Sequence, residues 1–136
     1  MSKPIPRVHK YMSTTPHTVR PSMTLAEAHK VMQQHHIRHL PVLDGGTLVG
    51  LLSDRDLRMV EAFKDVDPAQ VTVADAMSTE VYTVSPDALL DEVAREMAAK
   101  KYGSAVVMQN DKVVGVFTAV DGLTALAELL HTRLAG

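Results

Sequence analysis

The sequence contains no cysteine, no tryptophan and few aromatic residues of any kind. Without cysteine, the chain has no disulfide, no thiolate ligand for a metal and no cysteine nucleophile. Phenylalanine, tryptophan and tyrosine together make up 4% of the 136 residues, which leaves few stacking platforms for single-stranded nucleic acid. These absences exclude thiol enzymes and cysteine-based metal sites.

Strong charge of one sign and long apolar runs are also missing. The formal net charge is -2, so no broad basic face is available to neutralise a nucleic-acid backbone. No apolar run approaches the roughly 20 residues of a membrane span, and no apolar signal-peptide segment follows the first methionine. We therefore expect a cytoplasmic protein with neither a nucleic-acid nor a membrane partner. Apolar residues make up 46% of the chain, enough to bury a core.

The most informative feature that is present is an internal repeat. The tripeptide Met-Ser-Thr at 12–14 recurs 65 residues later at 77–79, and the same register holds without a gap from Tyr11 to Leu57. Self-similarity at a fixed period indicates two copies of one structural unit. We therefore predict a first repeat at 1–62, a polar linker at 63–70 and a second repeat at 71–136.

Each repeat has the pattern of a β-α-β-β-α unit. The elements expected in the first repeat are a short strand at 18–19, a helix from Thr24 to about His36, strands at 40–43 and 48–52, and a final helix from Ser53. The same elements are expected 65 residues later in the second repeat. One unit is too small to bury both faces of its sheet. We therefore predict an α/β (α+β) fold in which the two repeats pack against each other.

The junction between the last strand and the final helix carries the sharpest motif. Residues 50–56 and 115–121 share glycine, two apolar residues, serine or threonine, two variable residues and aspartate. A hydroxyl followed three residues later by a carboxylate is a helix N-cap pattern, which is a purely structural interpretation. The same helix N-terminus also offers free N–H groups and a positive dipole end to an anion. Because the aspartate can accept from both ribose hydroxyls, the motif also fits a nucleotide site.

Together with the run from Ile37 to Asp44, the paired junctions and the repeat resemble tandem cystathionine-β-synthase (CBS) domains. The resemblance covers roughly residues 8–130. It implies a free-standing pair of repeats packed about a pseudo-two-fold axis, which acts as a regulatory module and not as an enzyme. The ligands it implies are AMP, ADP, ATP or S-adenosylmethionine, bound between the repeats with no required cofactor. It also implies a homodimer and an effector protein that responds to the ligand.

The resemblance further implies composite clefts, in which the junction motif of one repeat faces the start of the middle strand of the other. One cleft would combine Thr118 and Asp121 with Ile37, Arg38 and His39, with Ile37 beside the base and the other two near phosphates. The residues implied for the other cleft are Ser53, Arg55, Asp56, Lys101, Tyr102, Gly103 and Ser104.

The two clefts are not equivalent. Gly103 stands where the first repeat has Arg38, and the second repeat lacks the proline found at Pro41. We therefore favour the cleft of Thr118 and Asp121 for a phosphorylated ligand, because Arg38 and its neighbour would supply donors there. The alternative is a ligand-free dimerisation scaffold. The leucine-rich stripe between 123 and 134 could contact a second copy, or it could pack on its own domain.

The histidines are a weaker candidate for function. His29, His35, His36 and His39 cluster near the end of the first long helix, but no acidic residue among them completes a metal site. We expect solvated histidines at a helix end and no metal site. The sequence also shows no set of nucleophile, base and orienting residue, so we predict no catalytic residues.

Overall fold

The structure, a computed structural model, describes residues 4–14 and 16–134. Within these residues the chain divides into two compact units, each with its own hydrophobic core. We call residues 16–81 the first-repeat unit, and residues 4–14 together with 82–134 the second-repeat unit. The predicted mixture of helices and strands is confirmed in both units.

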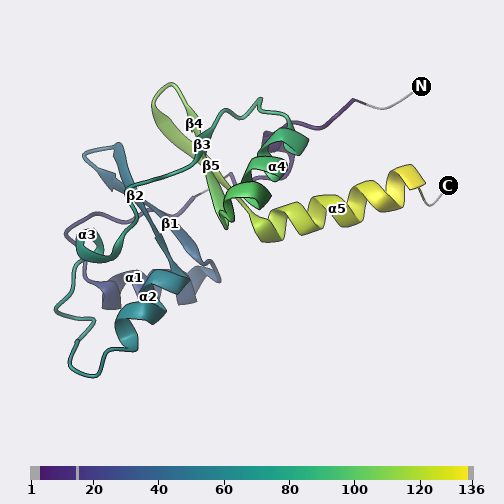
Figure 1. Ribbon diagram of the computed structural model, residues 1–136. Helices are drawn as coiled ribbons and strands as arrows, with labels where there is room; N and C mark the ends of the chain where they lie inside the picture. The colour runs from purple at the N-terminus through teal and green to yellow at the C-terminus, as the bar shows by residue number, and fades with distance from the viewer. Residues whose placement is uncertain (1–3, 15, 135–136) are drawn as a thin grey trace. The chain divides into compact units, whose positions relative to one another are not determined.

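The first-repeat unit packs two helices beside a hairpin. The hairpin consists of β1 (His39–Asp44) and β2 (Thr47–Ser53), and α1 (Leu25–His35) and α2 (Asp54–Glu61) lie next to each other below it (Figure 1). The expected strand at 18–19 is reduced to one parallel bridge between Val19 and Val42. A short helix, α3 (Val73–Ala76), completes the unit.

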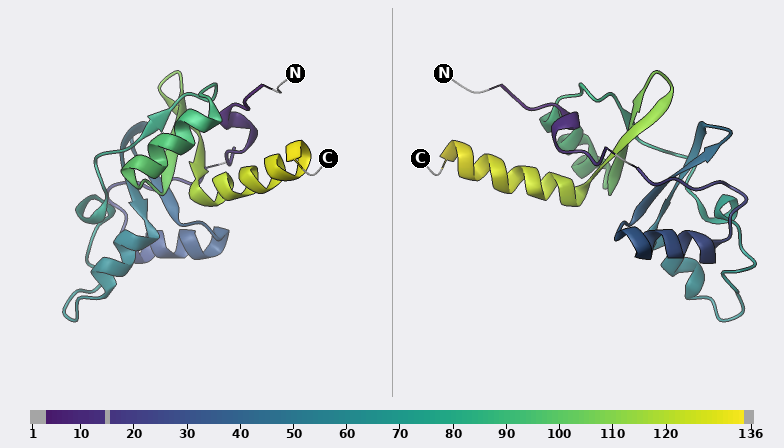
Figure 2. Two further views of the ribbon diagram at one scale, coloured as in Figure 1. Left: turned by 45° about the vertical axis from the view of Figure 1, so that its right-hand side comes forward. Right: turned by 180° about the vertical axis from the view of Figure 1, so that it is seen from behind.

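The elements of the second-repeat unit repeat the order of helix, hairpin and final helix, with a 3-10 helix and a short strand before them. They are the 3-10 helix η1 (Val8–Lys10), β3 (Thr83–Val84), α4 (Leu90–Lys100), β4 (Ser104–Gln109), β5 (Lys112–Thr118) and α5 (Ala119–Leu134). The central strand β4 pairs parallel with β3 and antiparallel with β5. Figure 2 shows α5 continuing directly from the end of β5. The predicted β-α-β-β-α order is therefore confirmed in this unit.

Local sequence signals explain where these elements begin and turn. Thr24 and Glu27 form the predicted capping box at the start of α1, in which the Thr24 side chain accepts from Glu27 N and the Glu27 side chain accepts from Thr24 N. The hairpin of the second unit turns at Asn110 and Asp111, whose φ angles are 52° and 62°. Two successive left-handed residues match the right-handed twist of the flanking strands, and asparagine and aspartate tolerate that conformation.

The core of each unit includes a residue from the segment that precedes the other repeat in the sequence. Val8 of η1 is fully buried in the core of the second-repeat unit, and Val73 of α3 is fully buried in the core of the first-repeat unit. Ser13 pairs with Val116 in the second-repeat unit, while the equivalent Ser78 bridges β2 in the first. The boundaries of the compact units therefore do not lie at residues 62 and 71. The bounds 62 and 71 describe the sequence repeats, and they stay a prediction.

The segment after α2 stays with the first-repeat unit because it bonds to the start of α1. Leu25 N donates to the Val71 carbonyl at 2.9 Å, and Ala26 N donates to the Pro68 carbonyl at 3.2 Å. The linker at 63–70 stays a prediction for the sequence repeats, and within it Pro68 lies against the first turn of α1. Among the described residues, no helix has both the length and the apolar character needed to cross a membrane.

Candidate functional site

In each unit, the two strands of the hairpin meet at the N-terminus of the final helix. In the first-repeat unit His39 pairs with Ser53, and Asp54 N donates to the Arg38 carbonyl at 2.8 Å. The structure therefore brings the start of the middle strand to the junction motif of its own repeat. We call residues 37–39 and 53–56 the first-repeat edge.

The second-repeat unit repeats this backbone arrangement. Ser104 pairs with Thr118, and Ala119 N donates to the Gly103 carbonyl at 3.0 Å. We call residues 102–104 and 118–121 the second-repeat edge. The expectation that Thr118 and Asp121 face residues 37–39 of the other repeat stays a prediction.

The predicted N-cap pattern is present at the first-repeat edge. Asp56 N donates to Ser53 Oγ at 3.2 Å, while Asp56 Oδ2 accepts from Ser53 N at 2.8 Å and from Ser53 Oγ at 2.9 Å. These contacts use only one carboxylate oxygen of Asp56. The structural and ligand-binding interpretations of the motif are therefore compatible, because the cap leaves Oδ1 for another donor.

The cap at the second-repeat edge is slightly different. Asp121 Oδ2 accepts from Thr118 N at 2.9 Å, and Asp121 N donates to Thr118 Oγ1 at 3.2 Å. Among the described residues, the Thr118 hydroxyl donates no hydrogen bond to Asp121, in contrast to the Ser53 hydroxyl at the other edge. Its proton is consequently free for another acceptor.

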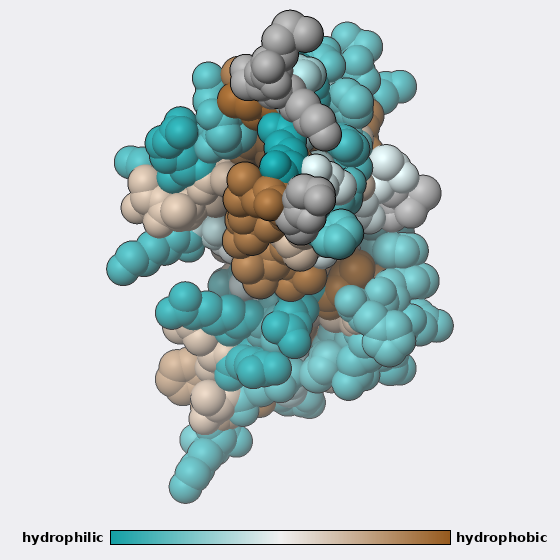
Figure 3. All heavy atoms as spheres, turned by 90° about the vertical axis from the view of Figure 1, so that its right-hand side faces the viewer, coloured by the Kyte–Doolittle hydropathy of each residue, from teal (hydrophilic) through white to brown (hydrophobic). Residues whose placement is uncertain are grey.

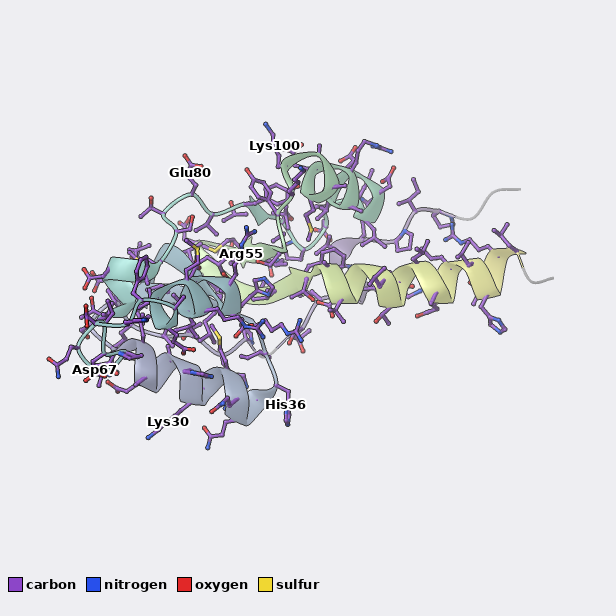
Figure 4. All side chains as sticks on the ribbon, turned by 60° about the horizontal axis from the view of Figure 1, so that its bottom comes forward. Lys30, His36, Arg55, Asp67, Glu80 and Lys100 are labelled. Atoms are coloured by element: carbon purple, nitrogen blue, oxygen red, sulfur yellow. The ribbon has the colours of Figure 1, made fainter. Side chains whose placement is uncertain are left out.

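The first-repeat edge carries two basic side chains that are exposed. They belong to Arg38 and Arg55, and Figure 4 labels Arg55 in the first turn of α2. Neither guanidinium makes an ion pair with any residue that the structure describes, whereas Arg58 pairs with Asp54 at 3.0 Å. The two free guanidinium groups make this edge attractive to an anion.

His39 at the same edge carries no fixed charge. Burial lowers the pKa of His39 below its usual 6.5, and the neighbouring Arg38 lowers this pKa further. Asp56 and Asp54 oppose the shift but do not reverse it. The lowered pKa leaves His39 neutral at pH 7, so the fixed positive charge at this edge comes from the arginines.

The second-repeat edge carries aromatic and small side chains instead. The ring of Tyr102 stacks on that of Tyr82, with centroids 5.4 Å apart and planes at 30°. Ser104 is only 4% exposed, and its Oγ has no hydrogen-bond partner among the described residues. Tyr82 is not among the residues that the sequence motifs indicate. The only signal was that it is one of just three tyrosines in a chain poor in aromatic residues.

The clustered histidines take separate structural places. His29 Nδ1 lies 2.9 Å from Glu61 Oε1, and the rings of His17 and His35 stack with centroids 3.5 Å apart. His36, which Figure 4 labels, follows the last residue of α1. Its φ of 54° lies in the left-handed region. Within the part of the chain that the structure describes, no group of three or more histidine, aspartate or glutamate side chains could hold a metal ion.

Comparison with known families identifies the repeat. A family profile for the CBS domain matches the chain twice, at residues 8–62 and at residues 73–128. The chain belongs to the CBS domain family. A relative in Bacillus subtilis, the CBS domain-containing protein YhcV, is 31% identical over 110 residues, which cover 81% of this chain and 78% of YhcV.

Solved structures of CBS domain pairs have the same fold. The CBS domain pair of protein MJ0100, in complex with 5′-methylthioadenosine and S-adenosyl-L-methionine, superposes with a TM-score of 0.83 at 28% identity, covering 92% of this chain and 98% of that one. CBSX2 in complex with AMP superposes with a TM-score of 0.80 at 25% identity, covering 90% and 97% respectively.

Some relatives are much longer proteins. The chain spans 24% of an inosine-5′-monophosphate dehydrogenase from Korarchaeum cryptofilum, with 30% identity over 122 residues. In that relative, therefore, the matching segment is a minor part of an enzyme. CBS domain pairs are in general regulatory modules, and the matched segments of this chain correspond to such a pair.

Proposed function

We propose that this CBS pair is a regulatory module that binds an adenosine-containing ligand at its two edges and signals to a partner protein. One observation carries the proposal. Each edge combines a helix N-terminus with a half-buried aspartate, Asp56 or Asp121, whose cap bonds use only one carboxylate oxygen. The adenosine compounds held by the similar CBS pairs, AMP in one and S-adenosylmethionine in another, support this ligand class.

Each edge has the groups that an adenosine ligand requires. The free carboxylate oxygen can accept from the vicinal hydroxyls of a ribose, which are the donors that a nucleoside always carries. The N–H groups of the first turn of α2 or α5 can donate to an acceptor on the ligand. The positive end of the helix dipole favours negative charge on that acceptor. A ligand that binds one conformation better than others shifts the population toward it, and a partner protein can respond to that shift.

Removing the aspartates tests this function. Calorimetric titration of the protein with AMP, ADP, ATP and S-adenosylmethionine should show binding by at least one of the four. Asp121→Ala and Asp56→Ala should each weaken binding at their own edge by about 10–100-fold, because a hydrogen bond to a charged group contributes about 1.5–3 kcal/mol.

Each substitution also removes a helix cap, so a matched control is needed. Asp75 forms the same kind of capping box with Thr72 at the start of α3, and neither residue belongs to an edge. Asp75→Ala should lose the cap and leave ligand affinity unchanged. The proposal is wrong if the folded wild-type protein gives no heat with any of the four compounds, or if Asp75→Ala weakens binding as much as Asp121→Ala.

A second candidate function, dimerisation, is favoured by an exposed apolar face on α5. Val120, Leu123, Leu130 and Leu134 are between 48% and 75% exposed and, with Ala127, recur at alternating steps of three and four residues. That spacing places all five on one seam of the helix, as in a coiled coil. Figure 3 faces the end of the molecule at which α5 stops and shows apolar atoms gathered there.

The charges at the two ends of α5 favour a second copy as the occupant of this seam. The first turn of α5 carries Asp121, while the last turn carries His131 and Arg133. An antiparallel pair of α5 helices places the acidic end of one against the basic end of the other and opposes their dipoles. The self-complementary seam therefore fits an isologous homodimer, in which the same surface is used twice.

Sedimentation velocity tests the homodimer. The wild-type protein should sediment as a dimer, and the double variant Leu123→Lys with Leu130→Lys should be a monomer with an unchanged circular dichroism spectrum. Thr132→Lys adds one positive charge at an exposed position of α5 outside the seam, and this variant should remain a dimer. A monomeric wild type, or a dimer that survives both lysines, would rule out this seam.

A further inference from the structure

We infer that residues 4–13, which we call the strap, hold the last turn of α5 and thereby control the homodimer seam. The docked strap keeps the second half of the seam helical, so the strap and a second copy of the chain stabilise each other. This inference rests on the homodimer proposed above, because it assigns a regulation to that same surface.

The second half of α5 extends beyond the core of its own unit. Ala125 is buried, and Leu129 is the last residue of the helix that packs against this core. Residues 130–134 are all exposed, with Leu130 at 48% and Leu134 at 75%. A helix end without tertiary contacts frays, because its last four carbonyls have no partner within the helix. Two of the five seam residues therefore lie where the helix needs support from outside.

A hydrogen bond to the strap supplies this support. Arg133 Nη2 donates to the Pro4 carbonyl at 2.8 Å, across 129 residues of chain. Among the residues that the structure describes, it is the only hydrogen bond that joins residues 130–134 to another element. The strap and α5 run toward the same end of the second-repeat unit (Figure 1). The strap therefore contacts the part of α5 that the core does not reach.

The middle of the strap is anchored to the start of α4. Val8 is fully buried in the core, and its N–H donates to the Ala88 carbonyl at 2.9 Å. The Pro6 carbonyl accepts from Leu90 N at 2.9 Å. These contacts fasten the strap to the body of the unit, so its first residue gives α5 a fixed point of attachment.

The other end of the strap reaches the strand that precedes α5. Ser13 and Val116 exchange two backbone hydrogen bonds, at 2.9 and 3.1 Å. Because β5 leads directly into α5, the strap connects the region where this helix begins to its last turn. The position of the last turn consequently depends on the strap as well as on the helix itself.

The homodimer seam requires a complete last turn. In an antiparallel pair, the C-terminal half of one seam packs on the N-terminal half of the other, so Leu130 and Leu134 contact the second copy only while they remain helical. Two binding events that favour the same conformation strengthen each other by the same factor. Release of the strap should therefore weaken the dimer, and dimerisation should tighten the strap.

Hydrogen exchange on a monomer isolates the effect of the strap on α5. The double variant Leu123→Lys with Leu130→Lys serves as the monomeric background. Arg133→Gln removes the bond to Pro4, and Val8→Ala loosens the anchor of the strap without changing α5. Either substitution should speed the exchange of the amides at 131–134 by about fivefold or more, because these amides exchange by local opening of the helix end.

Two controls match these substitutions. Val73→Ala deletes the same atoms from the fully buried valine that lies 65 positions later, in the other core. Arg95→Gln removes an exposed guanidinium of α4, whose nearest carboxylate oxygen, on Asp91, is 3.7 Å away. Both controls should change the exchange of the amides at 131–134 by less than about twofold, since neither residue contacts the strap or α5 through a hydrogen bond.

Sedimentation over a series of protein concentrations tests the coupling to the seam. With the seam intact, Arg133→Gln and Val8→Ala should each weaken the dimer by about threefold or more, and the two controls by less than about twofold. Arg133 also contributes charge at one end of the seam. Val8→Ala is therefore the deciding variant, because it leaves α5 and its charges unaltered.

The outcomes separate this inference from the homodimer itself. The inference is wrong if Val8→Ala leaves the exchange of the amides at 131–134 unchanged, or if it speeds exchange and the dimer affinity stays the same. In both cases the homodimer stands. A wild-type protein that sediments as a monomer overturns the homodimer, and the regulation inferred for it fails as well.

Discussion

Replacing Phe117 by alanine is expected to lower the free energy of unfolding by about 3–5 kcal/mol. Phe117 lies on β5, is 1% exposed, and belongs to the core cluster of the second-repeat unit together with Val8 and Ala105. Removing the ring takes away its buried apolar surface and leaves a cavity that a packed core refills only in part. Urea denaturation followed by circular dichroism measures the change.

The sequence offers a matched control for this prediction, because it contains only two phenylalanines. Phe63 follows α2 and is 63% exposed. Phe63→Ala deletes the same atoms from a side chain that is mostly in water, so the free energy of unfolding should change by no more than about 0.5 kcal/mol. Equal losses for the two variants, or a loss below about 1 kcal/mol for Phe117→Ala, would contradict the assignment of Phe117 to the core.

Replacing Gly115 by alanine is expected to lower the free energy of unfolding by about 3 kcal/mol, at the upper end of what overpacking usually costs. A Cβ at this position would lie 2.7 Å from Met12 Sδ and 2.7 Å from the Ser13 carbonyl oxygen. The thioether can move, but the carbonyl is held because it accepts from Val116 N at 3.1 Å. The substitution therefore forces the segment at 12–14 away from β5 or strains both.

Gly122 provides the control for Gly115. It lies inside α5, and the nearest atom to a Cβ built there is a ring atom of Phe117 at 3.7 Å, which is an ordinary contact. Gly122→Ala should raise the free energy of unfolding by about 1 kcal/mol, because alanine favours a helix interior more than glycine does. If Gly115→Ala is as stable as the wild type, the packing of Met12 and Ser13 on β5 is wrong.

Most of the secondary structure could be predicted because its causes are local. The capping box of Thr24 and Glu27 fixes the start of α1. Its two residues are only three positions apart, so the amino-acid sequence alone predicts it. The junction of Ser53 and Asp56 was recognised in the same way. The short helices η1 and α3 were not predicted, because three or four residues are too few to show a hydrophobic period.

The residues of the candidate site and their grouping across the two repeats stay predictions. Within the first-repeat unit, the structure adds that the Arg38 carbonyl accepts from Asp54 N, which brings the start of the middle strand to the junction motif. That proximity depends on the hairpin register, which pairs His39 with Ser53 across 14 residues of chain. Register depends on turn geometry and on which face is buried, and here it shifts between Val42 and Leu43.

The sequence by itself determined that two copies of one unit exist, and that each has a capped final helix with a hydroxyl and an aspartate at its start. Only the tertiary structure decided which core each leading segment joins. Met12 lies against Gly115, and Met77 lies against Gly50. Both contacts join a methionine to a glycine. The sequence is equally compatible with Met12 against Gly50 and Met77 against Gly115, because each contact would again join a methionine to a glycine. The path of the chain distinguishes them: residues 68–72 bond to the first turn of α1, and this holds α3 on the first core.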